Sequence, residues 1–277
     1  MKSFFAYSLI LTFCLLACGK KETTEDKTAT SNSVSTDTTS VMKPVKIDAR
    51  KIGPEKSSEQ ERIEDAIEQM EKNKSLPVVG YWVGAFGKNK INIALAGISN
   101  DQAIGYTVCA GNYRPIEGKV SVQGDSIYTF QMKEPGTDRY DGEFHFTINT
   151  NKGVMEGSWA PFKKGAATPK KFMLSKKTFE YNTDVGMYPQ ASSELLGEAD
   201  VENMLEEELE VMRNEIYARH GYSFKDKAMR ARFDSTSWYM PMGVDIREQL
   251  TDIEVQNIDL IYRYEEYYAE NYDSYGR

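Results

Sequence analysis

Few residues of this sequence combine the types and spacing that catalysis needs. The strongest acid–base group is Asp138, Glu143 and His145, which lie close together in the chain. Two positioned carboxyl groups can hydrolyse a glycosidic bond, and an imidazole can transfer a proton. However, Asp138 lies in a predicted turn, and apolar residues alternate with His145 along its strand, so His145 points away from the apolar face. Solvated polar residues are the favoured interpretation, and a hydrolase is the alternative.

The composition argues against metal, cofactor and nucleic-acid sites. The chain has two histidines and three cysteines, and Cys109 is the one thiol beyond Cys18, which leaves too few ligands for a zinc or iron–sulfur site. Cys109 lies in a strand pattern without a nearby histidine, which is typical of an inert buried thiol. The sequence contains no phosphate-binding loop and no glycine-rich dinucleotide turn. A formal charge of −8 disfavours nucleic acid. We therefore expect no catalytic residue, no metal and no cofactor.

Arg219 and His220 form the next candidate group, at the end of a predicted helix. We expect this helix to begin after Asp200, a good N-cap residue, and to end at Gly221, which accepts the left-handed conformation. Arg219 falls on the apolar stripe of the helix, with Glu215 one turn before it. An ion pair that fixes the helix end is the favoured interpretation, because an unpaired buried charge is costly. A catalytic or anion-binding Arg219–His220 pair is the alternative. The stripe itself comprises Val201, Met204, Leu205, Leu209, Met212 and Ile216.

Further helical signals follow, and they are rich in aromatic residues. Thr251 and Glu254 have the spacing of a capping box. Asn257 lies on the apolar stripe of the helix that follows, so we expect it to find a polar partner inside the domain. Tyrosine and tryptophan present rigid amphipathic surface, which suits glycan stacking or a protein interface. The binding candidates in this region are therefore Tyr217, Arg219, His220, Trp238 and Tyr239.

These C-terminal motifs resemble the YARHG domain, which is named for the sequence present here as Tyr217-Ala218-Arg219-His220-Gly221. The likeness runs from Met212 to Phe233 and continues through Trp238-Tyr239, Leu250-Thr251 and the segment from Asn257 to Glu265. It implies a small helical module, usually extracytoplasmic and often at the C-terminus of bacterial lipoproteins. The family has no established activity, so the resemblance implies no catalytic residue. Within the module we expect structural roles for Asn214, Glu215, Gly221 and Asn257.

The N-terminus has the pattern of a secretory leader. Residues 1–17 combine one early positive charge with an apolar run that is too short to span a bilayer. The leader ends in Leu15-Leu16-Ala17-Cys18-Gly19, which resembles the bacterial lipobox. The resemblance implies cleavage before Cys18, a diacylglycerol on its sulfur and an acyl chain such as palmitate on its amine. We therefore expect an anchor in a membrane of the bacterial cell envelope, namely the outer membrane on its periplasmic or surface face.

Residues 18–58 are polar and should form a disordered spacer, and residues 59–75 should form a short amphipathic helix. Residues 76–181 then change to short runs rich in Val, Ile, Tyr and Phe between Gly, Asn and Asp turns. No helical pattern separates the runs, so an antiparallel meander that forms a barrel or a sandwich is expected. The runs are Val78 to Phe86, Ile91 to Ile98, Ile104 to Ala110, Arg114 to Val122, Ser126 to Met132, Glu143 to Asn149, Val154 to Ala160 and Lys171 to Glu180.

Gly80-Tyr81-Trp82 is similar to the Gly-x-Trp sequence that opens lipocalin barrels, so Trp82 is a further binding candidate. A barrel of about eight strands is only wide enough for its own side chains or one small ligand. A filled core is the favoured interpretation, and a carrier of a small apolar ligand is the alternative.

The sequence thus predicts an α+β protein of two domains. A small antiparallel β-barrel or sandwich of about eight strands would be followed by a linker over residues 182–199 and a three-helix YARHG-like module over residues 200–277. The expected function is a non-enzymatic binding or scaffolding role at the cell envelope, with a protein or glycan partner and no nucleic acid. An envelope hydrolase that acts on wall or host polymers and an apolar-ligand carrier are the two alternatives.

Overall fold

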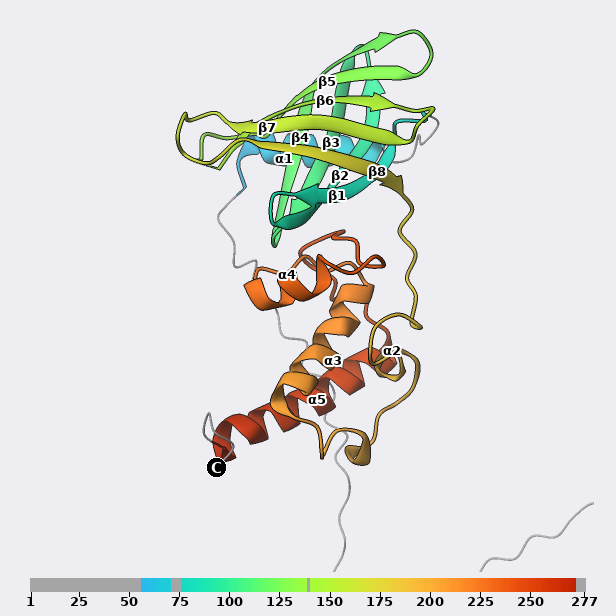
Figure 1. Cartoon of the computed structure of the whole chain (residues 1–277), viewed down its shortest axis with the longest axis vertical. Helices are drawn as coiled ribbons and strands as arrows, with labels where there is room; N and C mark the ends of the chain where they lie inside the picture. The colour runs from blue at the N-terminus through green and yellow to red at the C-terminus, as the bar shows by residue number, and fades with distance from the viewer. Residues whose placement is uncertain (1–55, 71–75, 139, 273–277) are drawn as a thin grey trace, which may run out of the picture. The chain divides into compact units, whose positions relative to one another are not determined.

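The computed structural model describes residues 56–70, 76–138 and 140–272 (Figure 1). The expected leader, Cys18 and nearly all of the expected spacer lie outside the described residues. The first described element is α1 (Ser58–Met70). The Ser57 hydroxyl accepts a hydrogen bond from the Gln60 amide and the Gln60 side chain accepts one from the Ser57 amide, at 3.2 and 2.9 Å. This reciprocal pair caps the start of the helix.

Eight antiparallel strands form a closed barrel in which each strand pairs with the next and β1 pairs with β8. The prediction of an antiparallel β domain of about eight strands is confirmed, and closure decides for the barrel over the sandwich. The strands are β1 (Gly80–Phe86), β2 (Asn89–Ser99), β3 (Gln102–Cys109), β4 (Asn112–Gln123), β5 (Ile127–Lys133), β6 (Gly142–Asn149), β7 (Val154–Pro161) and β8 (Lys170–Lys177).

Alternating side chains fill the inside of the barrel. On β6, Phe144, Phe146 and Ile148 are buried, whereas His145 is exposed on the outer face. Aromatic rings meet across the interior; the Phe130 and Phe146 centroids are 4.8 Å apart. Trp82 is fully buried in the same core and donates its indole N–H to the Val78 carbonyl at 2.9 Å. This packing supports a filled core and gives no support to a carrier of an apolar ligand.

The outer face of β2 and β3 is also apolar, and α1 covers it. Ile63 and Ile67 of α1 are buried against Ala94, Ala96 and Ile104. Burial of an isoleucine side chain stabilises by about 1.5–3 kcal/mol. The short helix therefore gains its stability from the barrel.

The helices after the barrel are α2 (Gln190–Ser193), the 3-10 turn η1 (Glu198–Asp200), α3 (Glu206–Arg219), α4 (Lys227–Phe233) and α5 (Asp252–Asn271). Leu209, Met212 and Ile216 of α3 pack with Ile258 and Ile261 of α5 in one core. Thr251 and Glu254 form the predicted capping box at the start of α5. Within the described part of the chain, no helix is both long enough and apolar enough to cross a membrane.

The predicted start of α3 is wrong. The helix begins at Glu206, and its first turn is capped by Glu208, whose carboxylate accepts a hydrogen bond from the Leu205 amide at 2.9 Å. Asp200 instead accepts from the Gly197 amide at 2.8 Å and closes η1. Val201 is buried in the same core as Leu209, but from the turn before α3 rather than from the helix.

Side chains of β2 contact the segments that follow α4. Lys90 donates to the Thr236 and Tyr239 carbonyls at 2.6 and 3.0 Å, and Asn92 donates to the Pro241 carbonyl at 3.1 Å.

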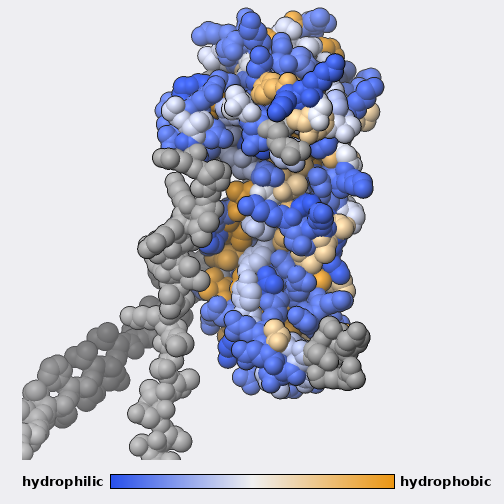
Figure 2. Space-filling view, turned by 90° about the vertical axis from the view of Figure 1, so that its left-hand side faces the viewer, coloured by the Kyte–Doolittle hydropathy of each residue, from blue (hydrophilic) through white to orange (hydrophobic). Residues whose placement is uncertain are grey.

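The face of the molecule shown in Figure 2 is largely hydrophilic, in keeping with the net charge of −8.

Candidate functional site

Arg219 is buried and holds the segment before α3 in place. Its guanidinium donates to the Val185 carbonyl at 2.8 and 3.0 Å, to the Tyr188 carbonyl at 2.9 Å and to the Ser192 hydroxyl at 3.0 Å. It also pairs with Glu215 at 3.2 Å, and its side chain is 0% exposed. All three nitrogens of the guanidinium have partners and its side chain has no exposed surface, so an anion in solvent cannot reach it. Its role is to fix the fold.

His220 is also buried, in a network of polar side chains. Its Nε2 lies 2.7 Å from Glu254 Oε2, and Tyr181 donates to Glu254 Oε1 at 3.0 Å and stacks on the imidazole with centroids 4.5 Å apart. Burial raises the pKa of Glu254, but hydrogen bonds from His220 and Thr251 outweigh it and hold that pKa below its usual range. This network ties the chain before α2 to α3 and α5.

The other polar residues of the motif region bind backbone groups. Glu215 accepts from the Met187 amide at 2.8 and 2.9 Å and from the Tyr188 amide at 2.9 Å. Asn257 accepts from the Leu196 amide and donates to the Ala191 and Glu194 carbonyls, all at 2.8 Å. These bonds satisfy polar groups that would otherwise be buried without partners. The stretch that precedes α3 is thereby packed onto α3 and α5.

Gly221 lets the chain reverse direction at the end of α3. Its φ of +76° is in the left-handed region, and a Cβ there would lie 2.9 Å from the Met240 carbonyl oxygen. The next residue, Tyr222, donates its amide to the Tyr217 carbonyl at 3.0 Å. The reversal brings the Tyr222 ring to 6.1 Å from the Tyr217 ring, edge to face.

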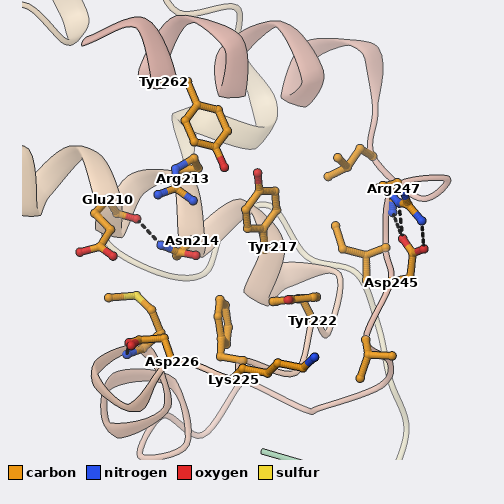
Figure 3. Close-up of a pocket in the computed structure, with 15 residues that line it drawn as sticks. Glu210, Arg213, Asn214, Tyr217, Tyr222, Lys225, Asp226, Asp245, Arg247 and Tyr262 are labelled. Atoms are coloured by element: carbon orange, nitrogen blue, oxygen red, sulfur yellow. Dashed lines mark hydrogen bonds and ion pairs between the residues drawn. The ribbon is translucent and has the colours of Figure 1, made fainter. Parts of the chain in front are cut away.

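Tyr217 and Tyr222 belong to a pocket of about 590 Å³, which we call the tyrosine pocket (Figure 3). Figure 3 shows that the hydroxyl groups of Tyr217 and Tyr262 point toward one another. Burial, and next the neighbouring Tyr262, raise the pKa of the Tyr217 hydroxyl, so it keeps its proton and can both donate and accept. The pocket is lined by Glu210, Arg213, Asn214, Tyr217, Tyr222, Phe224, Lys225, Asp226, Met229, Val244, Asp245, Ile246, Arg247, Leu250 and Tyr262.

The floor of the tyrosine pocket is buried and its rim is polar. Asn214 is 6% exposed and donates to the Glu210 carbonyl at 2.8 Å. Arg213 binds Glu265 through Nε and one terminal nitrogen at 3.0 and 3.1 Å, and its guanidinium carbon lies 4.5 Å from the centre of the Tyr262 ring. The pocket therefore combines aromatic faces, hydroxyl groups and firmly held polar side chains, the combination found in small-ligand sites.

Comparison with known families assigns the region that contains this pocket. Residues 185–266 match the YARHG domain. The match begins before α2, at the residue whose carbonyl Arg219 binds. It confirms the resemblance seen in the sequence and indicates an extracytoplasmic protein. No curated protein matches the chain. No solved structure matches it.

The remaining aromatic candidates lie outside the tyrosine pocket of the YARHG domain. Tyr239 is 2% exposed and donates its hydroxyl to the Tyr222 carbonyl at 2.8 Å. Trp238 is half-buried against Phe233, with ring centroids 6.0 Å apart. Trp82 lies inside the barrel. Of the predicted binding residues, Tyr217 is the one that lines the tyrosine pocket.

The residues named for a hydrolase do not build an enclosed site. His145 and Glu143 pair at 3.0 Å on the outside of the barrel, where the His145 side chain is 54% exposed. Asp138 lies in the turn between β5 and β6 and accepts from the Tyr140 amide at 3.1 Å. Burial raises the pKa of Cys109 to about 11, so this thiol is a poor nucleophile at neutral pH. Within the described ranges, no group of His, Cys, Asp and Glu side chains is placed to hold a metal ion.

Sequence reasoning missed several residues of the candidate site. One side of the tyrosine pocket is lined by Val244, Asp245 and Arg247. They lie in a segment without helical or strand periodicity, so no sequence pattern indicated them. Tyr222 and Tyr262 had a usable signal, because both are tyrosines outside the apolar stripes of their region. A buried carboxyl group, Glu134, was also missed; it follows β5 and reaches Trp159 of β7, so the contact spans β6.

Proposed function

We propose that this protein is a non-enzymatic binding protein of the bacterial cell envelope that holds its partner in the tyrosine pocket. The observation that supports the proposal is a pocket of about 590 Å³ built around Tyr217, the first residue of the YARHG motif. Polar residues of its floor, Asn214 and Arg213, are already held by hydrogen bonds, as in preformed ligand sites. A partner protein or a glycan would bind there, and catalytic groups are not needed for that role.

The pocket itself can be tested by filling it. Val244 lines the pocket and is 40% exposed, so Val244→Trp adds an indole there without removing a core residue. Val122 on β4 is 50% exposed outside the pocket lining, so Val122→Trp is the matched control. The wild type, Val244→Trp and Val122→Trp are each used as bait and incubated with envelope proteins and with wall fragments. We expect a partner captured by the wild type and by Val122→Trp to be lost with Val244→Trp. The proposal fails if no captured partner is lost with Val244→Trp.

We also propose that Cys18 carries lipid and anchors the protein, most simply in the outer membrane. The support is the apolar leader that ends at Ala17 and the cysteine that follows it. Each buried methylene contributes about 0.8 kcal/mol, so several acyl chains hold a protein stably at a bilayer. The polar residues 18–58 would then act as a flexible tether that lets the folded part reach its partner.

Metabolic labelling with an alkyne analogue of palmitate tests the anchor. We expect the wild type and Cys14→Ala to incorporate the label and Cys18→Ala to lose it. Cys14 lies in the leader, four residues before Cys18, so it controls for the loss of a nearby cysteine. Label retained by Cys18→Ala would contradict the assignment of the anchor while leaving the pocket proposal intact.

A further inference from the structure

The walls of the tyrosine pocket combine ring faces with hydroxyl groups. Tyr217, Tyr222 and Tyr262 all line it, and the Tyr262 side chain is accessible because the residue is 41% exposed. A tyrosine ring offers an apolar face, and its hydroxyl both donates and accepts hydrogen bonds. A ligand that matches these walls needs an apolar face and a polar, hydroxyl-bearing edge. A pyranose ring has both, with C–H groups on its faces and hydroxyl groups at its edge.

The charges of the pocket lining cancel. Three lining residues are acidic (Glu210, Asp226 and Asp245) and three are basic (Arg213, Lys225 and Arg247), so their formal sum is zero. Equal numbers of opposite charges leave the lining without a net charge that would attract an anion or a cation. The lining therefore favours a ligand without net charge.

Most of the charged groups are also engaged by other groups of the protein. Arg213 pairs with Glu265 and Arg247 pairs with Asp245. The Asp226 carboxylate caps α4 by accepting from the Ala228 and Met229 amides at 2.8 and 2.9 Å. The part-buried Arg213–Glu265 pair keeps its hydrogen-bonding atoms in fixed positions, which suits the fixed hydroxyl groups of a sugar ring.

The main alternative ligand is an extended peptide, but the described strands provide no free sheet edge for it. Peptides commonly add as a strand to an open sheet edge, but the eight described strands form a closed barrel, and closure removes free edges. The described lining of the pocket contains no strand, since its residues come from α3, α4, α5 and the segments between them.

We infer that the tyrosine pocket takes a neutral sugar unit of a glycan. This inference rests on the proposed binding function and names the chemical class of the ligand. A pocket of about 590 Å³ has room for a ligand of this kind, roughly one or two pyranose rings by the usual range of ligand pockets. Tyr217 and Tyr262 present hydroxyl groups to the sugar edge, and Tyr222 presents ring surface.

Calorimetric titration of the full-length protein, in a detergent without a sugar headgroup, tests the ligand class. The neutral probes are N,N′-diacetylchitobiose and cellobiose, the charged probes are the deacetylated chitobiose and cellobiuronic acid, and a capped tripeptide represents peptide ligands. We expect at least one neutral disaccharide to bind, with an affinity at least tenfold greater than that of its charged counterpart. Val244→Trp should reduce this affinity at least tenfold, and Val122→Trp should leave it unchanged.

A second variant covers the case in which Val244→Trp misfolds. Tyr262→Phe removes one hydroxyl group from the exposed rim, and we expect it to weaken disaccharide binding several-fold. Its control is Tyr272→Phe, because Tyr272 is 43% exposed and lies outside the pocket lining. Disaccharide binding that survives in both pocket variants overturns the inference. Binding of the tripeptide alone, lost with Val244→Trp, overturns the inference and leaves the proposed function standing. If none of the probes binds, the inference fails; the proposed function then fails separately only if the capture experiment also finds no pocket-dependent partner.

Discussion

The buried carboxyl group of Glu134 should make the stability of the barrel depend on pH. Glu134 is 6% exposed, and its Oε2 accepts from the Gly142 amide at 2.8 Å and from the Trp159 indole at 3.1 Å. The nearest cation, Arg114, has its Nε 3.8 Å from Glu134 Oε1 and also pairs with Asp141. Burial raises the pKa of Glu134 from its ordinary 4.5 to about 7, and Arg114 only partly opposes this.

The direction of the pH dependence follows from the raised pKa. Between pH 4.5 and about 7 the unfolded chain has lost the Glu134 proton while the folded chain still holds it, so the free energy of unfolding falls as pH rises through this window. Below the window the stabilisation is fully present, and above it is lost. A rise from 4.5 to about 7 corresponds to about 3 kcal/mol at 1.36 kcal/mol per pKa unit.

Glu134→Gln should remove this dependence. The glutamine carbonyl can accept both hydrogen bonds that Oε2 now accepts, and its neutral amide imitates the protonated acid. We expect the two proteins to have similar stability near pH 4.5, and the variant to be more stable by about 3 kcal/mol at pH 8. Glu156→Gln changes an exposed glutamate on β7 and is the matched control.

Urea unfolding followed by tryptophan fluorescence measures the effect. Trp159 bonds directly to Glu134, and Trp238→Phe in every background removes the tryptophan of the YARHG domain, so the signal reports on the barrel. Free energies of unfolding are compared at intervals from pH 4.5 to pH 8. Parallel curves for the wild type and Glu134→Gln over this range would refute the reasoning, because they would show that burial does not perturb the carboxyl group.

Two further substitutions test buried polar groups. The Arg219 guanidinium binds two carbonyls, a hydroxyl and Glu215, and the ammonium of Arg219→Lys cannot span them. We expect the free energy of unfolding in urea to fall by about 3 kcal/mol. A fall below about 0.5 kcal/mol, as for a typical surface change, would contradict the structural role. Asn92 is 0% exposed and its Oδ1 has no hydrogen-bond partner among the described atoms. Asn92→Asp should therefore bury a carboxylate and cost about 3 kcal/mol at pH 7, with recovery at pH 4 as the acid is protonated; equal losses at both pH values would contradict this.

The strands were predictable because their signals are local. Alternation places Phe144, Phe146 and Ile148 on one face of β6, and glycine-containing turns such as Gly124-Asp125 separate neighbouring strands. The sequence did not decide between a barrel and a sandwich, because the pairing of β1 with β8 joins residues far apart in the sequence. A local pattern carries no information about such a contact.

The error at the start of α3 has a similar cause. Val201 and Met204 continue the apolar spacing of the helix, so periodicity extends the prediction to Asp200. The competing signal is a second cap, in which Glu208 binds the Leu205 amide and Asp200 binds the Gly197 amide. Apolar spacing reports which side chains reach a core, and residues in a turn can reach the same core as residues in a helix.

The candidate site shows the same division between local and long-range information. Tyr217 was identified because it belongs to a motif, whereas Asp245 and Arg247 reach the pocket from an irregular segment. Arg114 lies on β4 and Glu134 follows β5, and they meet because these two strands pair. Charge alone could not mark them, since the sequence has many solvated residues of the same types.

The five residues of the motif have two different tasks, and helix geometry explains the division. Tyr217 and Arg219 are two positions apart, and at about 100° per residue their side chains point to nearly opposite sides of α3. Tyr217 lines the pocket, while Arg219 binds the carbonyls of Val185 and Tyr188. Gly221 then turns the chain so that Tyr222 returns to the pocket side. Changes at Arg219 should therefore reduce stability first, whereas changes on the rim of the pocket should reduce binding while the fold is kept.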